Sequence, residues 1–197
     1  MKSTVLAVIA LFTLSTVNAI EPIKEGTYSV DASKSTINWK GEKVTGEHVG
    51  FINIKSGDLI IKDGKLIGGE FVIDMSSLES TDLTGEYKGK LEGHLKSDDF
   101  FGVATYPTAN LKITKVKATG KNGNYEVTAD LTIKGITKPI MFTTTIIEAD
   151  GTMHANSNIV IDRSKYDVKY GSGSFFDDLG DKTIYDEFTL TVNLVTK

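Results

Sequence analysis

The sequence predicts an all-β protein in which antiparallel strands form either a closed barrel or a two-layer sandwich. Two segments, 125–133 and 187–194, alternate strictly between apolar and polar residues, and this period of two is typical of strands with one buried face. Nineteen glycines and only three prolines indicate tight turns between such strands. About ten segments look like strands, and a barrel of about eight strands is just wide enough to hold a slender ligand.

The alternation also predicts which side chains of the two clearest strands point inward. The inward residues are Tyr125, Val127, Leu131 and Ile133 in the first strand, and Phe188, Leu190 and Val192 in the second. The residues expected to face solvent are Thr128, Thr132, Thr189 and Thr191. The inward and outward assignments are either all correct or all reversed, because a shift of one residue would turn every side chain to the other face.

Weaker patterns predict the remaining strands and the turns between them. These strands cover about 27–31, 35–45, 48–54, 57–62, 65–75, 108–117, 138–148 and 152–162. Between strand-like runs lie Asp63-Gly64, Asn122-Gly123 and Asp150-Gly151, dipeptides that tolerate positive φ and favour hairpins. This order predicts a meander of sequential hairpins.

One segment breaks the strand pattern and predicts a helix over residues 84–97. Leu83, Tyr87, Leu91 and Leu95 recur every four residues, which is the spacing of a helical stripe. Glycines within this segment weaken the helix by up to ~1 kcal/mol each relative to alanine. We expect one short helix that crosses between two halves of the sheet.

The first nineteen residues are predicted to be a secretory signal peptide. Lys2 precedes a short apolar run at 5–12, and the small-x-small pattern at 17–19 places cleavage after Ala19. The run is too short to span a bilayer and no later segment approaches ~20 apolar residues, so no stable membrane anchor is expected. We therefore expect a single domain over residues 20–197 in a protein that is periplasmic or secreted.

The composition argues against several classes of function. The net charge is −4 at pH 7 with both signs interspersed, whereas a nucleic-acid partner would require a clustered basic surface. The chain has no cysteine and no Gly-x-Ser-x-Gly motif, and His48, His94 and His154 do not follow a zinc-binding spacing. These patterns assign no catalytic residue, no metal site and no cofactor.

Five segments carry a more specific signal through their order along the chain. They are Tyr28-Ser29-Val30-Asp31 with Ser35-Thr36-Ile37-Asn38-Trp39, then Gly46-Glu47-His48-Val49-Gly50-Phe51, then His94-Leu95-Lys96-Ser97-Asp98-Asp99-Phe100-Phe101 with Tyr106-Pro107, then Asp130-Leu131-Thr132-Ile133-Lys134-Gly135-Ile136-Thr137-Lys138-Pro139, and Ile161-Asp162-Arg163-Ser164-Lys165-Tyr166 with Gly180-Asp181. Each motif is weak alone. Together they resemble the YceI-like family of polyisoprenoid-binding periplasmic proteins over nearly the whole chain after the signal peptide.

This resemblance implies an extended antiparallel, lipocalin-like β-barrel of about eight strands that often forms a homodimer. It also implies a ligand with a long isoprenoid tail, such as a polyprenyl phosphate or an isoprenoid quinone. The chain departs from the family pattern at Gly102, which replaces an acidic residue, and in the loop at 175–178. These departures leave the identity of the ligand's head group open.

An apolar tail would need an elongated apolar cavity inside the barrel. The candidates for its lining are Trp39, Phe51, Phe71, Leu131, Phe100 and Phe175. Candidates for polar contacts with a head group are His48, His94, Lys134 and Arg163, of which arginine suits a phosphate best through its planar guanidinium. The alternative is that His94, Asp99 and Arg163 only attach the helix and a loop to the barrel through buried hydrogen bonds.

Three hypotheses of function follow. The first is a non-enzymatic protein that binds an isoprenoid lipid for transport, storage or stress protection. The second is an enzyme that acts on such a lipid and uses His94, Asp98 and Asp99 as acid and base. The third is a structural secreted protein whose cavity is incidental.

Overall fold

The computed structural model describes residues 24–120 and 123–197. The predicted signal peptide and Asn122 of one predicted turn lie outside these residues. Within the described part of the chain, no helix is long and apolar enough to cross a membrane.

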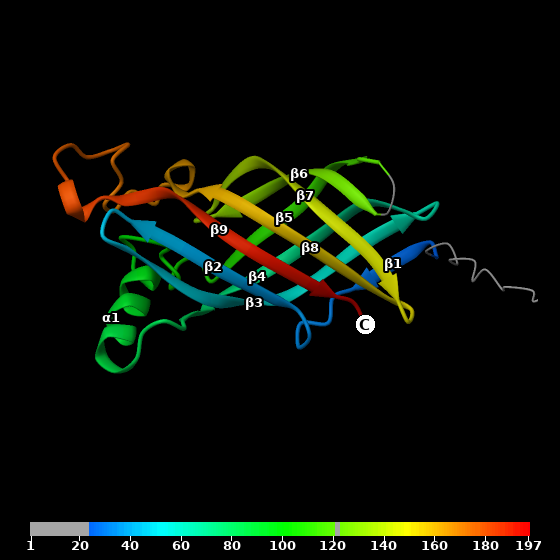
Figure 1. Ribbon diagram of the computed structural model, residues 1–197, viewed down its shortest axis with the longest axis horizontal. Coiled ribbons are helices and arrows are strands. Elements are labelled where there is room, and N and C mark those ends of the chain that lie inside the picture. Colours follow the sequence, from blue (N-terminus) through cyan, green and yellow to red (C-terminus); the bar gives the residue numbers. More distant parts are fainter. Residues whose placement is uncertain (1–23, 121–122) are drawn as a thin grey trace, which may run out of the picture.

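Over residues 24–120 and 123–197, nine antiparallel strands and one α-helix make up the fold (Figure 1). The strands are β1 (Gly26–Ser29), β2 (Thr36–Lys43), β3 (Gly46–Lys62), β4 (Lys65–Ser80), β5 (Thr108–Ala118), β6 (Asn124–Ile133), β7 (Ile136–Ala149), β8 (Thr152–Asp162) and β9 (Ile184–Val195). The helix α1 (Gly85–Lys96) lies between β4 and β5, and two short 3-10 helices, η1 (Arg163–Tyr166) and η2 (Gly180–Lys182), lie between β8 and β9. The helix predicted over 84–97 is therefore confirmed.

Strands β2 to β9 close into an eight-stranded barrel. The meander of neighbouring strands is closed where β2 pairs with β9, and β3 pairs along its length with β4. The long β3 is flanked on its other side by two strands in turn, β2 along Gly46–Ile52 and β1 along Asp58–Ile61. The predicted barrel is confirmed, and the alternative of a two-layer sandwich is wrong.

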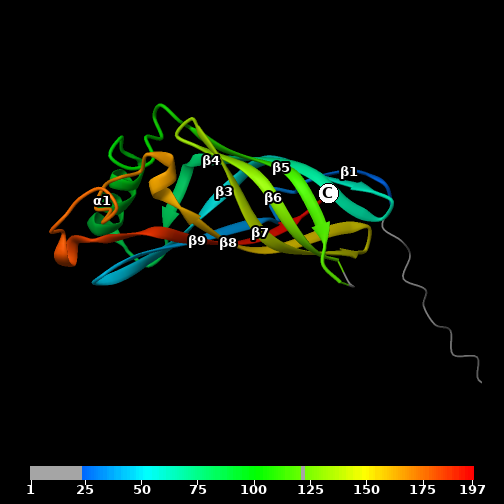
Figure 2. The same ribbon diagram turned by 90° about the horizontal axis from the view of Figure 1, so that it is seen from above.

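The barrel is elongated and its two ends differ (Figures 1 and 2). We call one the helix end, because α1 and the long segment 163–183 lie there together. The other, the hairpin end, carries the tight turns that follow β3 and β7, as well as the C-terminus. In both turns an aspartate and a glycine have positive φ, 49° and 70° at Asp63-Gly64 and 52° and 77° at Asp150-Gly151. These two turn predictions are confirmed, because paired positive φ angles define the hairpin turn that such dipeptides favour.

The predicted side-chain directions in β6 and β9 are also confirmed. In β6, Tyr125, Val127, Leu131 and Ile133 are all buried, whereas Thr128 and Thr132 are partly exposed on the outer face. In β9, Val192 is buried and Thr191 is exposed. Sheet closure therefore gathers the apolar faces of these strands into one interior.

Two predicted strand boundaries are wrong for the same reason. The segments 48–54 and 57–62 form one continuous strand, β3, and the strand predicted over 65–75 continues to Ser80. The pairing of β3 with β4 shifts register at three places, near Phe51, Ile54 and Ile60. Each bulge inserts an unpaired residue and changes which side chains face inward, so the alternation that sequence reading relies on is interrupted inside a single strand.

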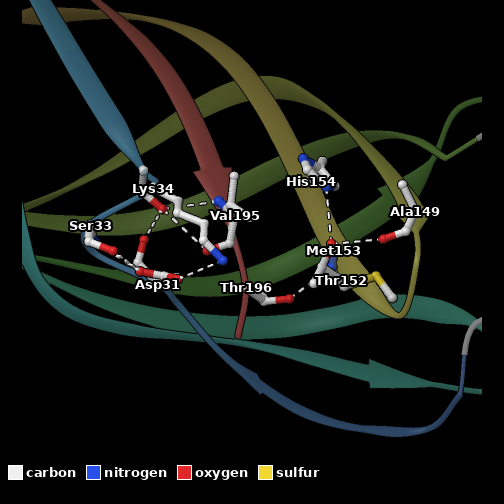
Figure 3. A network of polar contacts seen from close by, with 10 residues as sticks. Asp31, Ser33, Lys34, Ala149, Thr152, Met153, His154, Val195 and Thr196 are labelled. Carbon is white, nitrogen blue, oxygen red and sulfur yellow. Dashed lines mark hydrogen bonds and ion pairs between the residues drawn. The ribbon is translucent and has the colours of Figure 1, made fainter.

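A network of polar contacts joins the strands at the hairpin end (Figure 3). The Asp31 carboxylate accepts hydrogen bonds from the backbone N–H and the hydroxyl of Ser33 and lies 3.3 Å from the Lys34 ammonium. The fully buried Thr196 hydroxyl accepts a hydrogen bond of 2.8 Å from the backbone N–H of Met153. The contacts of Asp31 order the β1–β2 connection, and the contact of Thr196 attaches the end of the chain after β9 to β8.

Candidate ligand-binding cavity

A cavity of about 250 Å3 runs inside the barrel. All eight strands of the ring and α1 contribute to its lining, which extends from Leu59 and Leu66 toward the hairpin end to Gly41 and His94 at the helix end. Between the two ends, Thr144 and Ser157 are the only described residues that interrupt an apolar surface. The expected elongated apolar cavity is thus present, and four predicted lining residues contribute to it: Trp39, Phe71, Phe100 and Leu131.

Two of these aromatic side chains lie directly on glycines. Trp39 pairs with Gly50 across β2 and β3, and a Cβ atom at Gly50 would come within 2.5 Å of the indole ring. The indole Nε1 donates a hydrogen bond of 3.2 Å to the Phe51 carbonyl oxygen. Likewise, a Cβ atom at Gly57 would lie 2.5 Å from the Phe71 ring. Glycine at both positions gives each ring its space against the barrel wall.

Large buried side chains close the cavity at the hairpin end. Tyr125, Ile61 and Met153 are buried in the interior without lining the cavity. The Tyr125 hydroxyl accepts a hydrogen bond of 3.3 Å from the backbone N–H of Leu66, a residue that does line it. The cavity therefore ends blindly against a packed layer.

The opening lies at the helix end, where the lining includes exposed and charged residues. Lys43 and Glu187 are exposed, and with Glu42 and Arg163 they are the only lysine, arginine, aspartate or glutamate residues among the described residues that line the cavity. We call this opening, between the ends of β2 and β3, the start of β9 and α1, the mouth.

His94 projects from α1 into the cavity near the mouth. Its ring makes edge contacts with Tyr170, at 4.3 Å between centroids, and with Phe100, at 5.7 Å. Its Nε2 atom is buried and has no hydrogen-bond partner among the described residues. An unsatisfied buried polar atom costs about 1–3 kcal/mol, so this nitrogen is a ready partner for a polar group of a bound molecule.

Arg163 is the buried cation of the helix end, with only 2% of its surface exposed. Its guanidinium donates hydrogen bonds to the carbonyl oxygens of Tyr185, Val168 and Ile184, at 3.1, 2.7 and 2.9 Å. Nη2 lies 3.6 Å from Oδ1 of Asp186. Burial lowers the pKa of Arg163, and the charge of Asp186 opposes this effect. These contacts support the structural role for Arg163, in which it attaches segment 163–168 to the start of β9.

His48 lines the cavity from β3 and pairs with Asp82. The His48 Nδ1 atom lies 2.7 Å from Oδ2 of Asp82, whose other oxygen accepts hydrogen bonds from the Val49 N–H and the Ser80 hydroxyl. Burial raises the pKa of Asp82, but the hydrogen bonds from His48, Ser80 and Val49 outweigh burial and lower it to about 2. The pair joins β3 to the segment that precedes α1.

Three of the predicted site residues lie outside the cavity. Phe51 follows inward Gly50 and precedes inward Ile52, so it is on the outer face of β3. Phe175 is 44% exposed, with the Lys169 ammonium 5.3 Å from its ring centroid. The Lys134 ammonium donates hydrogen bonds to the carbonyl oxygens of Asp98 and Asp167, at 3.3 and 3.2 Å, so it connects two loops rather than facing a head group.

The acid–base cluster required by the enzyme hypothesis does not assemble. Asp98 and Asp99 are exposed and line no part of the cavity, and the buried Nε2 of His94 has no carboxylate partner among the described residues. No group of three or more histidine, aspartate or glutamate residues in the described part of the chain is arranged to hold a metal ion.

The sequence analysis missed several residues that line the cavity. The apolar ones include Ile73 and Met75 of β4, Ile140, Phe142 and Ile146 of β7, and Leu95 of α1. The alternation within 138–148 was sufficient to place the β7 residues, since they are two residues apart on one face. No local pattern places Glu42 and Glu187 at the mouth, because they meet there only when β2 pairs with β9.

Comparisons with known proteins agree with this architecture. The model of the YceI-like domain matches residues 28–196. The chain belongs to the YceI-like family. It is 32% identical over 118 residues to a UPF0312 protein of Vibrio parahaemolyticus, covering 57% of this chain and 59% of that protein. It is 36% identical over 85 residues to a UPF0312 protein of Pseudomonas savastanoi, covering 39% and 44%. These matches span less than two thirds of the length of either relative.

Two solved structures show the same fold as this YceI-like chain. The crystal structure of BcnA from Burkholderia cenocepacia has a TM-score of 0.67 at 23% identity, covering 85% of this chain and 99% of that one. A polyisoprenoid binding domain from Saccharophagus degradans, implicated in plant cell wall breakdown, has a TM-score of 0.64 at 19% identity, covering 86% and 97%. At these identities the likeness establishes the fold.

Proposed function

We propose that this YceI-like protein binds the apolar chain of an isoprenoid lipid inside its barrel and carries or stores that lipid in the periplasm or outside the cell. One observation carries the proposal: an elongated, almost wholly apolar cavity that is blind at the hairpin end and open at the helix end. An isoprenoid chain offers no hydrogen bonds, so its binding depends on burial, at about 0.8 kcal/mol per methylene group. The Saccharophagus domain, described as polyisoprenoid-binding, supports this ligand class.

The arrangement of polar groups favours binding over catalysis. General acid–base chemistry requires a proton donor and acceptor within hydrogen-bond reach of the reacting group. His94 faces the cavity, whereas Asp98 and Asp99 lie outside it. A binding protein needs only the apolar interior and a few polar groups that orient one end of the ligand.

A charge placed in the cavity wall tests the proposal. In the Leu131→Asp variant, lipid retention should be lost, because a carboxylate among apolar side chains costs several kcal/mol or is forced into its neutral form. Val160→Asp is the matched control, since Val160 is 55% exposed on the outer face of β8 and does not line the cavity. Organic extraction and mass spectrometry measure the lipid, and circular dichroism establishes that each variant is folded. Undiminished lipid in folded Leu131→Asp protein would contradict the proposal.

Replacing His94 separates binding from catalysis. The His94→Asn variant keeps a hydrogen-bonding side chain and removes the titratable imidazole, so bound lipid should persist and its mass should not change with time. An enzyme that used His94 as acid or base should lose ~100-fold or more in rate. The measurement compares lipid masses after incubation with wild-type and variant protein. Conversion to a new mass by wild-type protein alone would identify an enzyme.

A further inference from the structure

A second, polar hollow adjoins the mouth of the apolar cavity. It is lined by Glu42, Gly173, Ser174, Thr183, Ile184, Tyr185, Asp186 and Glu187. Four of these residues also line the apolar cavity: Glu42, Ile184, Tyr185 and Glu187. We call this hollow the vestibule. A lipid whose chain fills the barrel and whose head reaches the mouth would place that head against the vestibule.

Every charged residue that lines the vestibule is a carboxylate. Glu42, Asp186 and Glu187 contribute to its wall, and none of the described lysine or arginine residues does. The Ser174 hydroxyl already donates a hydrogen bond of 2.5 Å to Oδ2 of Asp186, while Oδ1 of Asp186 is buried without a hydrogen-bond partner. The vestibule thus offers acceptors to a hydroxyl group and repels an anion.

The buried cation beside the vestibule is already engaged. Arg163 donates to three backbone carbonyl oxygens and has Asp186 at 3.6 Å. Recognition of a phosphate by arginine depends on a guanidinium free to present paired N–H groups to the anion. Three of the five N–H donors of Arg163 are thus used by carbonyl oxygens, two of them at the start of β9, and the Asp186 carboxylate offsets the charge of the guanidinium. The guanidinium therefore serves the fold and presents an anion with a charge that is already compensated.

The surface lysines of the mouth do not reverse this balance. Lys40 forms ion pairs with Glu42, at 3.2 Å, and with Glu47, at 3.5 Å. Lys43 lines the cavity but is exposed, and Glu187 also lines it. Lys43 therefore faces one exposed carboxylate of the mouth, while Lys40 is already paired, so the lysines offset the carboxylates without making the mouth cationic. His94 also lines the cavity, and its Nε2 atom, which has no hydrogen-bond partner among the described residues, suits a hydroxyl group.

We propose that the cavity and its vestibule select an isoprenoid chain that ends in an uncharged, hydrogen-bond-donating head, such as an alcohol or a phenol, over the same chain ending in phosphate. This selection rests on the proposed function, since it presumes that the chain of the lipid occupies the barrel. It follows from a wall that supplies hydrogen-bond acceptors, an arginine whose charge is compensated by Asp186 and three of whose five donors are occupied, and three carboxylates at the place where the head emerges.

Two probes of equal chain length test the selection, geranylgeraniol and geranylgeranyl phosphate. Each is titrated against the full-length protein at low ionic strength, with displacement of a fluorescent apolar probe as the readout. The alcohol should bind at least ~10-fold more tightly, and the difference should narrow as salt is added, because ions screen the repulsion. Comparable or tighter binding of the phosphate by the wild-type protein would overturn the selection and leave the lipid-binding function standing. Failure of both probes to bind would overturn the proposed function and the selection with it.

A charge-neutral variant of the vestibule assigns the selection to its carboxylates. In the Glu42→Gln, Glu187→Gln double variant, the affinity for geranylgeranyl phosphate should rise ~5-fold or more, while the affinity for the alcohol should stay within about 2-fold. Glu47→Gln is the matched control, because Glu47 also pairs with Lys40 but lines neither the vestibule nor the cavity. Unchanged phosphate affinity in the double variant, or an equal rise in the control, would refute the role of the vestibule.

Discussion

The two ends of the barrel are built in opposite ways. At the hairpin end, β3 and β7 are each followed by a two-residue turn, and the interior is sealed by Tyr125, Ile61 and Met153. At the helix end, two long connections, from β4 to β5 and from β8 to β9, leave large side chains exposed, among them Tyr87, Tyr170, Phe175 and Phe176. Loops can vary their side chains at little cost to the fold when a rigid scaffold holds them, so the helix end is the end that can accommodate a binding site.

The pattern of unsatisfied polar atoms follows the same division. The buried side-chain atoms without a hydrogen-bond partner among the described residues are Nε2 of His94, the hydroxyl of Tyr166 and Oδ1 of Asp186, and all three residues belong to the helix end. Burial, with a contribution from Asp162, raises the pKa of Tyr166 to about 12, so the phenol stays neutral. Such orphaned groups are rare in folded proteins and call for a functional or structural explanation. At the hairpin end, by contrast, the buried Thr196 hydroxyl has a partner.

Removing Arg163 should disrupt the helix end most severely. The Arg163→Met variant leaves three carbonyl oxygens without donors and Asp186 without its countercharge, so the free energy of unfolding should fall by about 3–5 kcal/mol. Denaturant titration measures the loss. Hydrogen exchange should show that residues 163–187 lose protection before the strands at the hairpin end do.

Arg163→Lys serves as the control for charge alone. It keeps a cation near Asp186 but replaces the planar, five-donor group by a point charge, so an intermediate loss is expected. If the free energy of unfolding of Arg163→Met lies within about 1 kcal/mol of the wild-type value, the buried arginine does not hold the helix end together. The distinction drawn between the two ends would then be wrong.

Residues in regular, locally encoded elements could be predicted from the sequence. The stripe that predicted α1, the Asp-Gly turns and the inward position of Leu131 each depend on neighbours within a few positions along the chain. Phe51 could not be placed, because apolar residues occupy both faces of this stretch, Val49 and Phe51 on one and Ile52 and Ile54 on the other, and only the folded strand shows that Ile52 and Ile54 face inward. The departure at Gly102 also has a local reason that only the structure shows. Its φ of 57° favours glycine, and a Cβ atom there would lie 3.3 Å from the Tyr106 ring.

The polar residues of the site were harder to interpret than the apolar ones. Lys134 looked suited to a head group, yet it bonds to carbonyl oxygens of Asp98 and Asp167, which lie more than thirty positions away in the sequence. The vestibule combines Glu42, Ser174 and Asp186, which come from three separate segments. A lysine or glutamate can serve many partners, so only the closure of the barrel determines which one it meets.

Truncating Tyr125, one of the large side chains that close the cavity at the hairpin end, should extend the cavity into the space that the ring leaves. In Tyr125→Ala, the lost ring and its hydrogen bond to Leu66 should lower the free energy of unfolding by about 3 kcal/mol. The space released should favour longer chains, so the ratio of affinities for a 40-carbon over a 20-carbon prenol should rise. Tyr125→Phe keeps the ring, and should cost about 1 kcal/mol while leaving the ratio unchanged. An unchanged ratio in Tyr125→Ala would show that Tyr125 does not limit the length of the ligand.

The smallest expected change in stability comes from removing the charge of Asp82, which contacts His48 at the edge of the mouth. Asp82 has its pKa lowered to about 2 in the folded protein, below the ordinary value of 3.8. A lowered folded-state pKa stabilises the protein fully above the unfolded-state value and ceases to do so as pH falls through the folded-state value. Asp82→Asn should therefore lower the free energy of unfolding by about 1 kcal/mol at pH 5, a figure reduced for the partial exposure of the pair. The difference from wild type should shrink steadily between pH 4 and pH 2.

The hairpin end supplies the control for this measurement. Asp63 forms no ion pair among the described residues and occupies a turn position with φ of 49° that asparagine also tolerates. Asp63→Asn should leave the free energy of unfolding within about 0.5 kcal/mol of wild type over the same pH range. Urea titrations at half-unit steps of pH compare the three proteins. An Asp82→Asn deficit that stays constant down to pH 2 would mean that the lost stability comes from geometry rather than from the charge of Asp82.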